Sequence, residues 1–273
     1  MKTVIQVWTH NFNIDKSHVD KYNYLNETNF YFGLGDLIRS SLKLYKLSKQ
    51  MGFGFIIDIQ LHPISEFLKI DKHPYFEYVS EHKNEVNYVC YGAVEDYINS
   101  YEDNEIILLL TNDFLTDEDL DSESKQIIKN IFVPNYKFQN FINTKFSKIP
   151  FEKWNIFHYR INDNEFLNKQ ESIDLDVFLS HIKKYKEEND VLITDTKTLK
   201  DHIFNNDDIF MFDTKICHLG LSVNSDEIRD TLFELFLIIH SSKIKTYCKI
   251  HSISGFVKWI SKVYNIPLVQ FNY

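Results

Sequence analysis

The chain alternates short apolar runs with longer amphipathic stretches along most of its length. Residues 106–110 form an unbroken aliphatic run, which is typical of a strand covered by helices on both faces. In residues 36–51 the apolar side chains recur at helical spacing. Further strands are expected at residues 4–8, 53–59, 154–159, 190–194 and 244–248. This alternation of strands and helices predicts an α/β fold.

The region 132–150 separates two α/β halves of similar size. It is less regular than its surroundings and contains Pro134 and Pro150. A chain of 273 residues is long enough for two domains of ordinary size, each with its own core. We therefore expect an N-terminal domain at residues 1–150 and a C-terminal domain at residues 151–273.

Charge, cysteine spacing and apolar spans limit the classes of protein that fit. The formal net charge is −9 and no basic stripe is present, which argues against nucleic acid as a partner. Cys90, Cys217 and Cys248 are too far apart for a metal site or a disulfide framework. No apolar span reaches the ~18 residues of a membrane helix, and the first apolar run is too short for a signal peptide. We therefore expect a cytoplasmic protein with no membrane span.

Two glycines lead into the first long amphipathic stretch, in the motif Gly33-Leu34-Gly35-Asp36. Backbone N–H groups at a helix start attract anions and polar ligand groups. The third glycine of a dinucleotide fingerprint is missing, which disfavours a Rossmann oxidoreductase. The motif predicts a ligand-binding loop, and a helix start with no ligand is the alternative.

A second motif ends the expected strand at residues 154–159. His158, Arg160 and Asp163 follow one another within six residues. In open α/β sheets, ligands bind beyond the carboxyl ends of the strands. The planar guanidinium of Arg160 is always charged and suits bidentate binding of a phosphate. The alternative is a stabilising pair between Arg160 and Asp163.

Two further strand ends carry polar residues before a helix. Asp195 follows an expected strand and could accept hydrogen bonds from a base or a ribose, although it could also cap the next helix. Residues 252–256 place Ser252, Ser254 and Gly255 before a helix, which predicts a phosphate-binding helix start. Ordinary capping is the alternative there.

Acidic pairs raise the question of a metal ion, because metal-dependent sugar transferases often use an Asp-x-Asp turn. Two of the pairs precede expected helices, where first-turn carboxylates are favourable without a metal. No His/Cys spacing of a metal site accompanies them. We therefore expect no metal site. The pairs are Asp117/Asp119, Asp174/Asp176 and Asp207/Asp208.

Taken together, the four motifs resemble the fucosyltransferase superfamily, in order and spacing, over about residues 30–270. This superfamily includes nodulation fucosyltransferase, the core α-1,6 enzyme and protein O-fucosyltransferases. Its Gly-x-Gly-Asn loop is similar to residues 33–36, and its His-x-Arg-Arg-Gly-Asp motif is similar to residues 158–163. A Thr-Asp strand end and a Ser-x-Phe turn match residues 194–195 and 254–256.

Three positions depart from the family pattern. Ile161 stands where the second arginine is expected, and Asn162 stands where the glycine is expected. Asp36 replaces the asparagine of the loop. The first change weakens the phosphate clamp, and the last changes the hydrogen-bonding group near the sugar.

The resemblance implies a GT-B-like fold, with two Rossmann-like domains facing each other across a cleft. It implies that GDP-fucose, or a related nucleotide sugar, is the donor substrate and that no further cofactor is needed. Residues 151–273 would bind the donor, and residues 1–150 would form the acceptor side. The acceptor would be a hydroxyl group of a glycan or of another molecule.

Carried over residue by residue, the resemblance assigns the donor site. Arg160 would bind the diphosphate, His158 and Asp195 would contact the guanine, and Asp163 would belong to the same site. The phosphate side would be lined by Ser252, Ser254, Gly255 and Phe256.

On the other side, Gly33, Gly35 and Asp36 would face the donor sugar and the acceptor. Arg160 would stabilise the leaving diphosphate, and Asp36 would act as general base in a metal-independent inverting displacement. One alternative is a non-catalytic relative that binds a nucleotide sugar or glycan, because the second arginine is missing. Another is a metal-dependent transferase of the other fold class.

Overall fold

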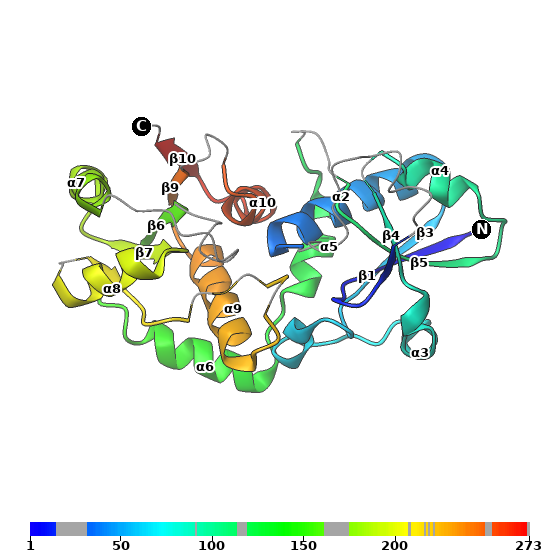
Figure 1. The fold of residues 1–273 in the computed structure, drawn as a ribbon, viewed down its shortest axis with the longest axis horizontal. Helices are drawn as coiled ribbons and strands as arrows, with labels where there is room; N and C mark the ends of the chain where they lie inside the picture. Colours follow the sequence, from blue (N-terminus) through cyan, green and yellow to red (C-terminus); the bar gives the residue numbers. More distant parts are fainter. Residues whose placement is uncertain are drawn as a thin grey trace. The chain divides into compact units, whose positions relative to one another are not determined.

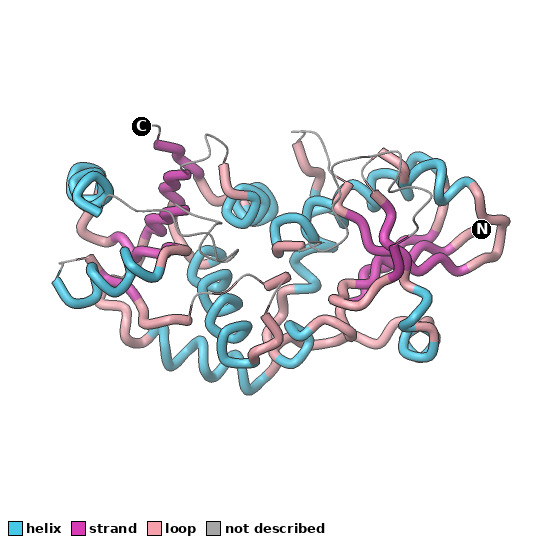
Figure 2. Tube along the Cα trace, in the orientation of Figure 1, coloured by secondary structure: helices cyan, strands magenta, loops and turns pink. Residues whose placement is uncertain are grey.

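The protein is described by a computed structural model that divides into two compact units, Met1–Phe138 and Gln139–Tyr273. Within the described residues, each unit contains a five-stranded parallel sheet flanked by helices (Figures 1 and 2). The α/β prediction is therefore confirmed. The described residues are 1–14, 32–90, 92–113, 119–160, 175–206, 209–215, 217, 219–220, 222–248 and 253–271.

The sheet of the first unit has the strand order β2-β4-β5-β1-β3. The central strands β1 and β5 are almost fully buried, as the unbroken aliphatic run of β5 predicts. The strands are β1 (Thr3–Val7), β2 (Asn13–Ile14), β3 (Gly54–Asp58), β4 (Asn87–Val89) and β5 (Ile106–Thr111). The helices are α2 (Leu34–Met51), α3 (Phe76–Glu81), α4 (Val94–Asn99) and α5 (Ser122–Ile131), with 3-10 turns η1 (Pro63–Glu66) and η2 (Lys83–Glu85).

Helix α2 confirms the amphipathic pattern at residues 36–51 and begins two residues earlier, at Leu34. It ends at Gly52, whose φ of 74° is a left-handed conformation that glycine adopts without a Cβ penalty. A buried polar contact fixes the helix on the sheet. The side chain of Gln6 in β1 donates to Ser40 Oγ (2.8 Å) and accepts from Ser41 Oγ (2.6 Å).

The sheet of the second unit has the strand order β10-β9-β6-β7-β8. Its central strand β6 is flanked by β7 and β9, and all three are largely buried. The strands are β6 (Asn155–Arg160), β7 (Asp190–Thr194), β8 (Phe210–Met211), β9 (Ile244–Cys248) and β10 (Leu268–Phe271). The helices are α6 (Tyr136–Phe146), α7 (Leu175–Tyr185), α8 (Lys197–Asn206), α9 (Ser225–Ile239) and α10 (Gly255–Tyr264). The division between the units falls inside α6, after Phe138.

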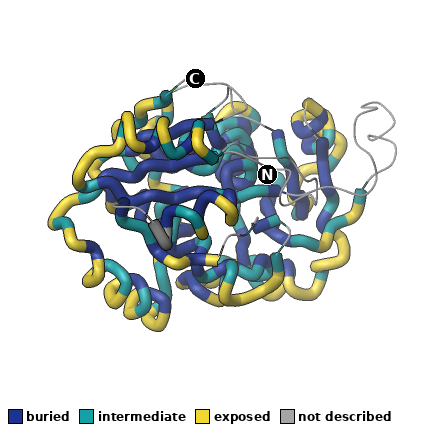
Figure 3. Tube along the Cα trace, turned by 60° about the vertical axis from the view of Figure 1, so that its left-hand side comes forward, coloured by how far each residue is buried: buried dark blue, intermediate teal, exposed yellow. Residues whose placement is uncertain are grey.

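Each unit has its own hydrophobic core between its sheet and its helices. The strands form the buried interior of each unit, and the outer faces of the helices are exposed (Figure 3). One charged pair also lies in the second core: Lys245 of β9 bonds to the carboxylate of Asp190 and to the carbonyl of Tyr185 (2.9 Å). Because this pair has a backbone partner as well, the buried ammonium group is compensated.

Candidate functional site

The predicted C-terminal motifs meet at the carboxyl edge of the second sheet. In the parallel register, Arg160 of β6 lies opposite Cys248 of β9, and Tyr159 lies opposite Thr194 of β7. Three strands therefore end side by side. Asp195, which follows β7, and Ser254, at the start of α10, lie at the same edge, because they bond to Tyr159 and Arg160 of β6.

Arg160 is half-buried at the end of β6 and contacts the start of α10. Its Nη1 donates to Ser254 Oγ at 3.2 Å, across 94 positions of sequence. Ser254 is the N-cap residue of α10, yet its side chain makes no capping hydrogen bond. The structure therefore joins the strand-end arginine to the predicted helix start, and simple capping does not explain Ser254.

The start of α10 adds backbone donors beside the guanidinium. Ser254 is buried, whereas Gly255 and Phe256 are half-buried in the first turn. The first N–H groups of a helix have no partner inside the helix and carry partial positive charge. A guanidinium beside a helix N-terminus forms an arrangement suited to an anion.

His158 lies below this edge, 4% exposed, and is held from the neighbouring strand. Its Nδ1 is hydrogen-bonded to Thr246 Oγ1 at 3.0 Å. Burial, together with the charge of Arg160, lowers the pKa of His158 to about 3. The imidazole is therefore neutral at ordinary pH. Its ring centre is 6.5 Å from that of Phe256.

Asp195 follows β7 and is half-buried at the same edge. Its backbone N–H donates to the carbonyl of Tyr159 (3.3 Å), and its Oδ1 accepts a hydrogen bond from Thr196 Oγ1 (3.2 Å). These contacts fix the residue beside the end of β6. Asp163 and Ser252 lie outside the described residues, as do Ile161 and Asn162.

In the first unit, the glycine motif forms the start of α2. Gly33 is the N-cap residue, and its N–H donates to Asp36 Oδ2 at 3.2 Å. The other carboxylate oxygen of Asp36 forms an ion pair with Arg39 at 2.9 Å. Arg39 in turn donates to the carbonyl of Asn112, beyond β5, at 3.5 Å. Gly35 is buried in the first turn of the helix.

The structure also shows polar residues that sequence reasoning missed. Thr246, the partner of His158, is on β9, and only the strand register reveals the pairing. At the end of β3, the buried Asp58 is bonded to His73 Nε2 at 2.7 Å. His62 is 2% exposed, with its ring centre 4.8 Å from that of His10. Asp58 ends an apolar strand, and Asp195 directly follows one. The sequence signal that identified Asp195 could therefore have identified Asp58.

Burial governs the protonation of His62. It lowers the pKa of His62 to about 3, with a smaller contribution from His10. The Nδ1 atom of His62 accepts a hydrogen bond from the backbone N–H of Ile64 at 3.2 Å, so the ring proton is on Nε2. His62 is therefore a neutral, fixed side chain at the carboxyl edge of the first sheet.

The described part of the chain contains no group of three or more His, Cys, Asp or Glu side chains that could hold a metal ion. No helix in it combines the length and the apolar character needed to cross a bilayer.

No protein-family model and no curated protein matches the sequence. Solved structures do match. NodZ α-1,6-fucosyltransferase co-crystallised with GDP has a TM-score of 0.57 at 11% identity, over 99% of this chain and 94% of that chain. Fucosyltransferase NodZ from Bradyrhizobium has a TM-score of 0.57 at 12% identity, over 99% and 95%. A variant of Arabidopsis thaliana FUT1 in complex with GDP has a TM-score of 0.53 at 7% identity, over 98% and 69%.

These similarities extend over nearly the whole of this chain and therefore include both parallel sheets. At identities of 7–12% they establish the architecture rather than the chemistry of particular residues. The two parallel five-stranded sheets and the matching solved structures agree with each other. The chain has a fucosyltransferase-like GT-B fold.

Proposed function

We propose that this protein is a glycosyltransferase that transfers fucose from GDP-fucose to a hydroxyl group of a glycan or other acceptor. The observation that carries the proposal is the hydrogen bond from Arg160 to Ser254 at the start of α10. It places a permanent positive charge and a helix N-terminus together at the carboxyl edge of a parallel sheet. The similar structures of NodZ and FUT1 with GDP support the same assignment.

The second unit binds the donor in this proposal. Arg160 and the first N–H groups of α10 contact the diphosphate, with Ser252 and Asp163 in the adjoining segments. The Asp195 carboxylate accepts hydrogen bonds from the N–H groups of the guanine, and the neutral His158 lies beneath the base. Guanine offers paired donors that a carboxylate can accept, which favours GDP over UDP or CDP.

The reaction is a direct displacement with inversion at the anomeric carbon and without a metal ion. A bond forms from the acceptor oxygen to C1 of fucose, and the bond from C1 to the diphosphate oxygen breaks with its electron pair going to GDP. Arg160 stabilises the charge that develops on the diphosphate. Asp36 takes the proton of the acceptor hydroxyl, with Gly33 and Gly35 shaping the acceptor side in the first unit.

Asp36 has two contacts that must be compatible with its proposed role as general base. Each carboxylate oxygen already has one partner, Gly33 N–H or Arg39. A carboxylate has about four lone-pair positions, so an acceptor hydroxyl can be accommodated besides these two contacts. The same contacts fix the orientation of the carboxylate before any substrate binds.

The donor assignment is tested by thermal unfolding with GDP, UDP, CDP and ADP. We expect GDP alone to raise the melting temperature, because ligands that bind only the native state stabilise it. The second measurement is the release of GDP from GDP-fucose with a panel of glycan acceptors, in buffer with and without a chelator. Stabilisation by UDP instead of GDP would contradict the donor assignment, and loss of turnover in the chelator would contradict the metal-independent step.

A non-catalytic nucleotide-sugar-binding or glycan-binding protein is the second candidate. It is favoured by Ile161, which stands where the family has a second arginine for the phosphate clamp. This candidate predicts specific binding of GDP and GDP-fucose with neither transfer nor hydrolysis. Measurable turnover that depends on Arg160 would rule it out.

A further inference from the structure

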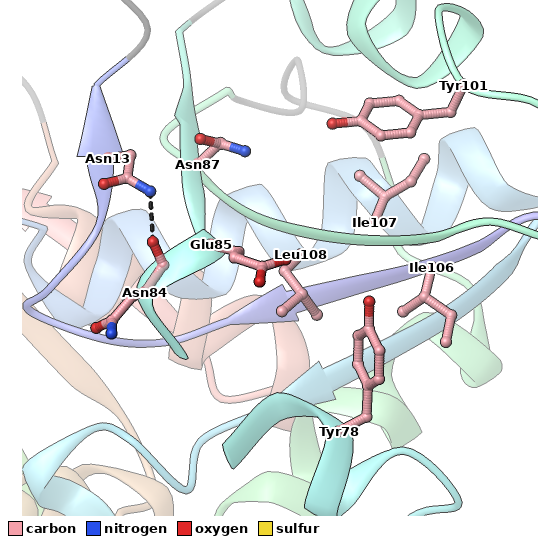
Figure 4. A pocket seen from close by; sticks show the side chains of 9 residues that line it. All are labelled: Asn13, Tyr78, Asn84, Glu85, Asn87, Tyr101, Ile106, Ile107 and Leu108. Carbon is pink, nitrogen blue, oxygen red and sulfur yellow. Dashed lines mark hydrogen bonds between the residues drawn. The ribbon is translucent and has the colours of Figure 1, made fainter. Parts of the chain in front are cut away.

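A cavity of about 340 Å³ lies at the amino edge of the first sheet (Figure 4). This edge is opposite to the strand ends that lead to the glycine motif. The volume falls within the ~300–1,000 Å³ of small-molecule sites. Its lining residues come from the starts of β2, β4 and β5, from α3 and η2, and from the segment after α4: Asn13, Tyr78, Asn84, Glu85, Asn87, Tyr101, Ile106, Ile107 and Leu108.

The cavity exists because β5 begins before β4 does. In the register of the two strands, Asn87 at the start of β4 lies opposite Leu109, so residues 106–108 extend beyond it. On the other side of β5, Thr3 N–H donates to the carbonyl of Glu105. Because backbone groups alternate in direction along a strand, those of Ile106 point away from β1, toward the side that β4 does not reach.

Two tyrosines border this stretch of β5 from opposite faces of the sheet, with their hydroxyls directed into the cavity (Figure 4). Tyr78 is backed by His82, with the rings stacked at 3.9 Å. The hydroxyl of Tyr101 is hydrogen-bonded to that of Tyr97 (2.8 Å), which accepts from Asn87 Nδ2 (3.0 Å). Both ring positions are therefore fixed by their neighbours.

The remaining lining groups are amides and one carboxylate. Asn13 Nδ2 donates to the carbonyl of Asn84 at 2.6 Å, which fixes that amide at the rim. Within the described residues, neither the hydroxyl of Tyr78 nor the carboxylate of Glu85 has a hydrogen-bond partner. Burial and the charge of Glu85 raise the pKa of Tyr78, so its hydroxyl remains a donor at neutral pH.

The charges and polar groups select a class of ligand. None of the described lining residues carries a positive charge, and Glu85 repels anions, so a phosphate or nucleotide does not fit. The aliphatic lining is limited to the three β5 residues, which is too little for a lipid. Phenol, amide and carboxylate groups beside aromatic rings match the hydroxyls and the C–H faces of a neutral saccharide.

We infer that this cavity binds a neutral mono- or disaccharide, at a site separate from the donor-binding residues. The sugar ring packs against Tyr78, and the sugar hydroxyls donate hydrogen bonds to Glu85. At the opposite wall, the side chains of Asn87 and Tyr101 form hydrogen bonds with the sugar. The donor residues belong to the other unit, at the carboxyl edge of its sheet. The inference therefore goes beyond the proposed transfer and does not depend on the identity of the donor.

Saturation-transfer difference NMR on the full chain tests the inference, with glucose, galactose, N-acetylglucosamine, lactose and cellobiose at millimolar concentrations. We expect saturable binding of at least one of these sugars. Tyr78→Ala should weaken it at least about tenfold, as loss of an aromatic anchor does in other interfaces. Tyr136→Ala is the matched control, because this tyrosine is 82% exposed and outside the cavity. GDP binding, measured by calorimetry, should be the same in all these proteins.

A second variant keeps the test decisive if Tyr78→Ala unfolds. Glu85 is exposed, and Glu85→Ala should weaken the same sugar several-fold with an unchanged melting temperature. Absence of saturable binding for the whole panel, or equal affinities in wild type and Glu85→Ala, would overturn the inference. Sugar binding without any GDP binding would uphold it and contradict the proposed donor.

Discussion

The carboxyl edges of the two sheets hold their charged residues in different ways. In the second unit, Arg160 reaches from a strand end to Ser254 at a helix start 94 positions away. In the first unit, the sequence neighbours Gly33 and Arg39, within one turn of helix, are the polar partners of Asp36 among the described residues. Local helix formation explains the contacts of Asp36, but it does not explain those of Arg160. Arg160 is therefore the stronger candidate of the two for a functional role.

Two buried histidines, one in each unit, also differ in their hydrogen-bond partners. His158 in the second unit and His62 in the first are both almost fully buried, and burial lowers the pKa of each to about 3. Their partners differ: His158 is bonded to a hydroxyl of the next strand, and His62 is bonded to a backbone N–H two residues ahead. The two histidines have similar pKa values but different hydrogen-bond partners. Variants of each can therefore separate an effect on stability from an effect on ligand binding.

The largest expected effect is the loss of stability in acid. Each histidine has a pKa of about 3 when folded and near 6.5 when unfolded, so the unfolded state binds more protons between these values. The two histidines should not affect stability above pH ~6.5, and below it each should lower stability by about 1.4 kcal/mol per pH unit.

Urea unfolding from neutral pH down to pH ~4 measures this slope. His62→Gln should remove one histidine's share of it and leave the share of His158. A variant with the same slope as wild type would show that the ring of His62 is not buried as a neutral group.

The next effect concerns the acid-base step. Asp36→Asn keeps the size of the side chain and its contact with Gly33, and it removes the basic group. Loss of a general base costs about 10²- to 10⁴-fold in rate, so we expect kcat to fall at least about 100-fold with GDP affinity unchanged. A steady-state assay with a chosen acceptor measures it. A fall of less than tenfold would restrict Asp36 to capping α2.

Thr246→Val has a smaller expected effect. It removes the hydroxyl that partners His158 and keeps the shape of the side chain. A buried polar group left without its partner costs about 1–3 kcal/mol, so the free energy of unfolding should fall by that amount. GDP should also bind more weakly because the imidazole is no longer fixed. Thr246→Ser, which retains the hydroxyl, should recover most of the GDP affinity, and failure to recover it would contradict the positioning role of Thr246.

The smallest effect is expected for the ion pair of the first unit. Arg39 and Asp36 are both partly exposed, at 29% and 36% of their side chains, and such pairs contribute up to about 1 kcal/mol. Arg39→Gln should therefore lower the free energy of unfolding by less than about 1 kcal/mol and leave GDP affinity unchanged. A large loss of GDP binding in this variant would contradict the proposal that the second unit binds the donor.

The sequence predicted the features that depend on local pattern. The aliphatic run identifies β5, and the amphipathic spacing identifies α2. Each pattern lies within a single element and depends on which of its side chains are buried. Arg160 and Ser254 were each recognisable, because a charge at a strand end and a hydroxyl at a helix start are local features. The resemblance implied that both lie beside a phosphate, but the hydrogen bond between them was not predicted.

Features that depend on strand register could not be predicted. The bond from His158 to Thr246 joins strands whose alignment is fixed by packing of the whole sheet. The cavity beside β5 likewise depends on β4 beginning opposite Leu109, a property of neither strand alone. The boundary predicted at residue 150 and the donor and acceptor roles of the two units remain predictions.

Calorimetric titration of GDP tests the central claim most directly, using wild type, Arg160→Ala and Arg229→Ala. Arg229 is the matched control, since it is a partly exposed arginine of the same unit that is paired with Asp226 and Asp230. Loss of hydrogen bonds to a charged group costs about 1.5–3 kcal/mol, so Arg160→Ala should bind GDP roughly 10- to 100-fold more weakly. Arg229→Ala should match wild type. Equal GDP affinity in Arg160→Ala and wild type would contradict the account.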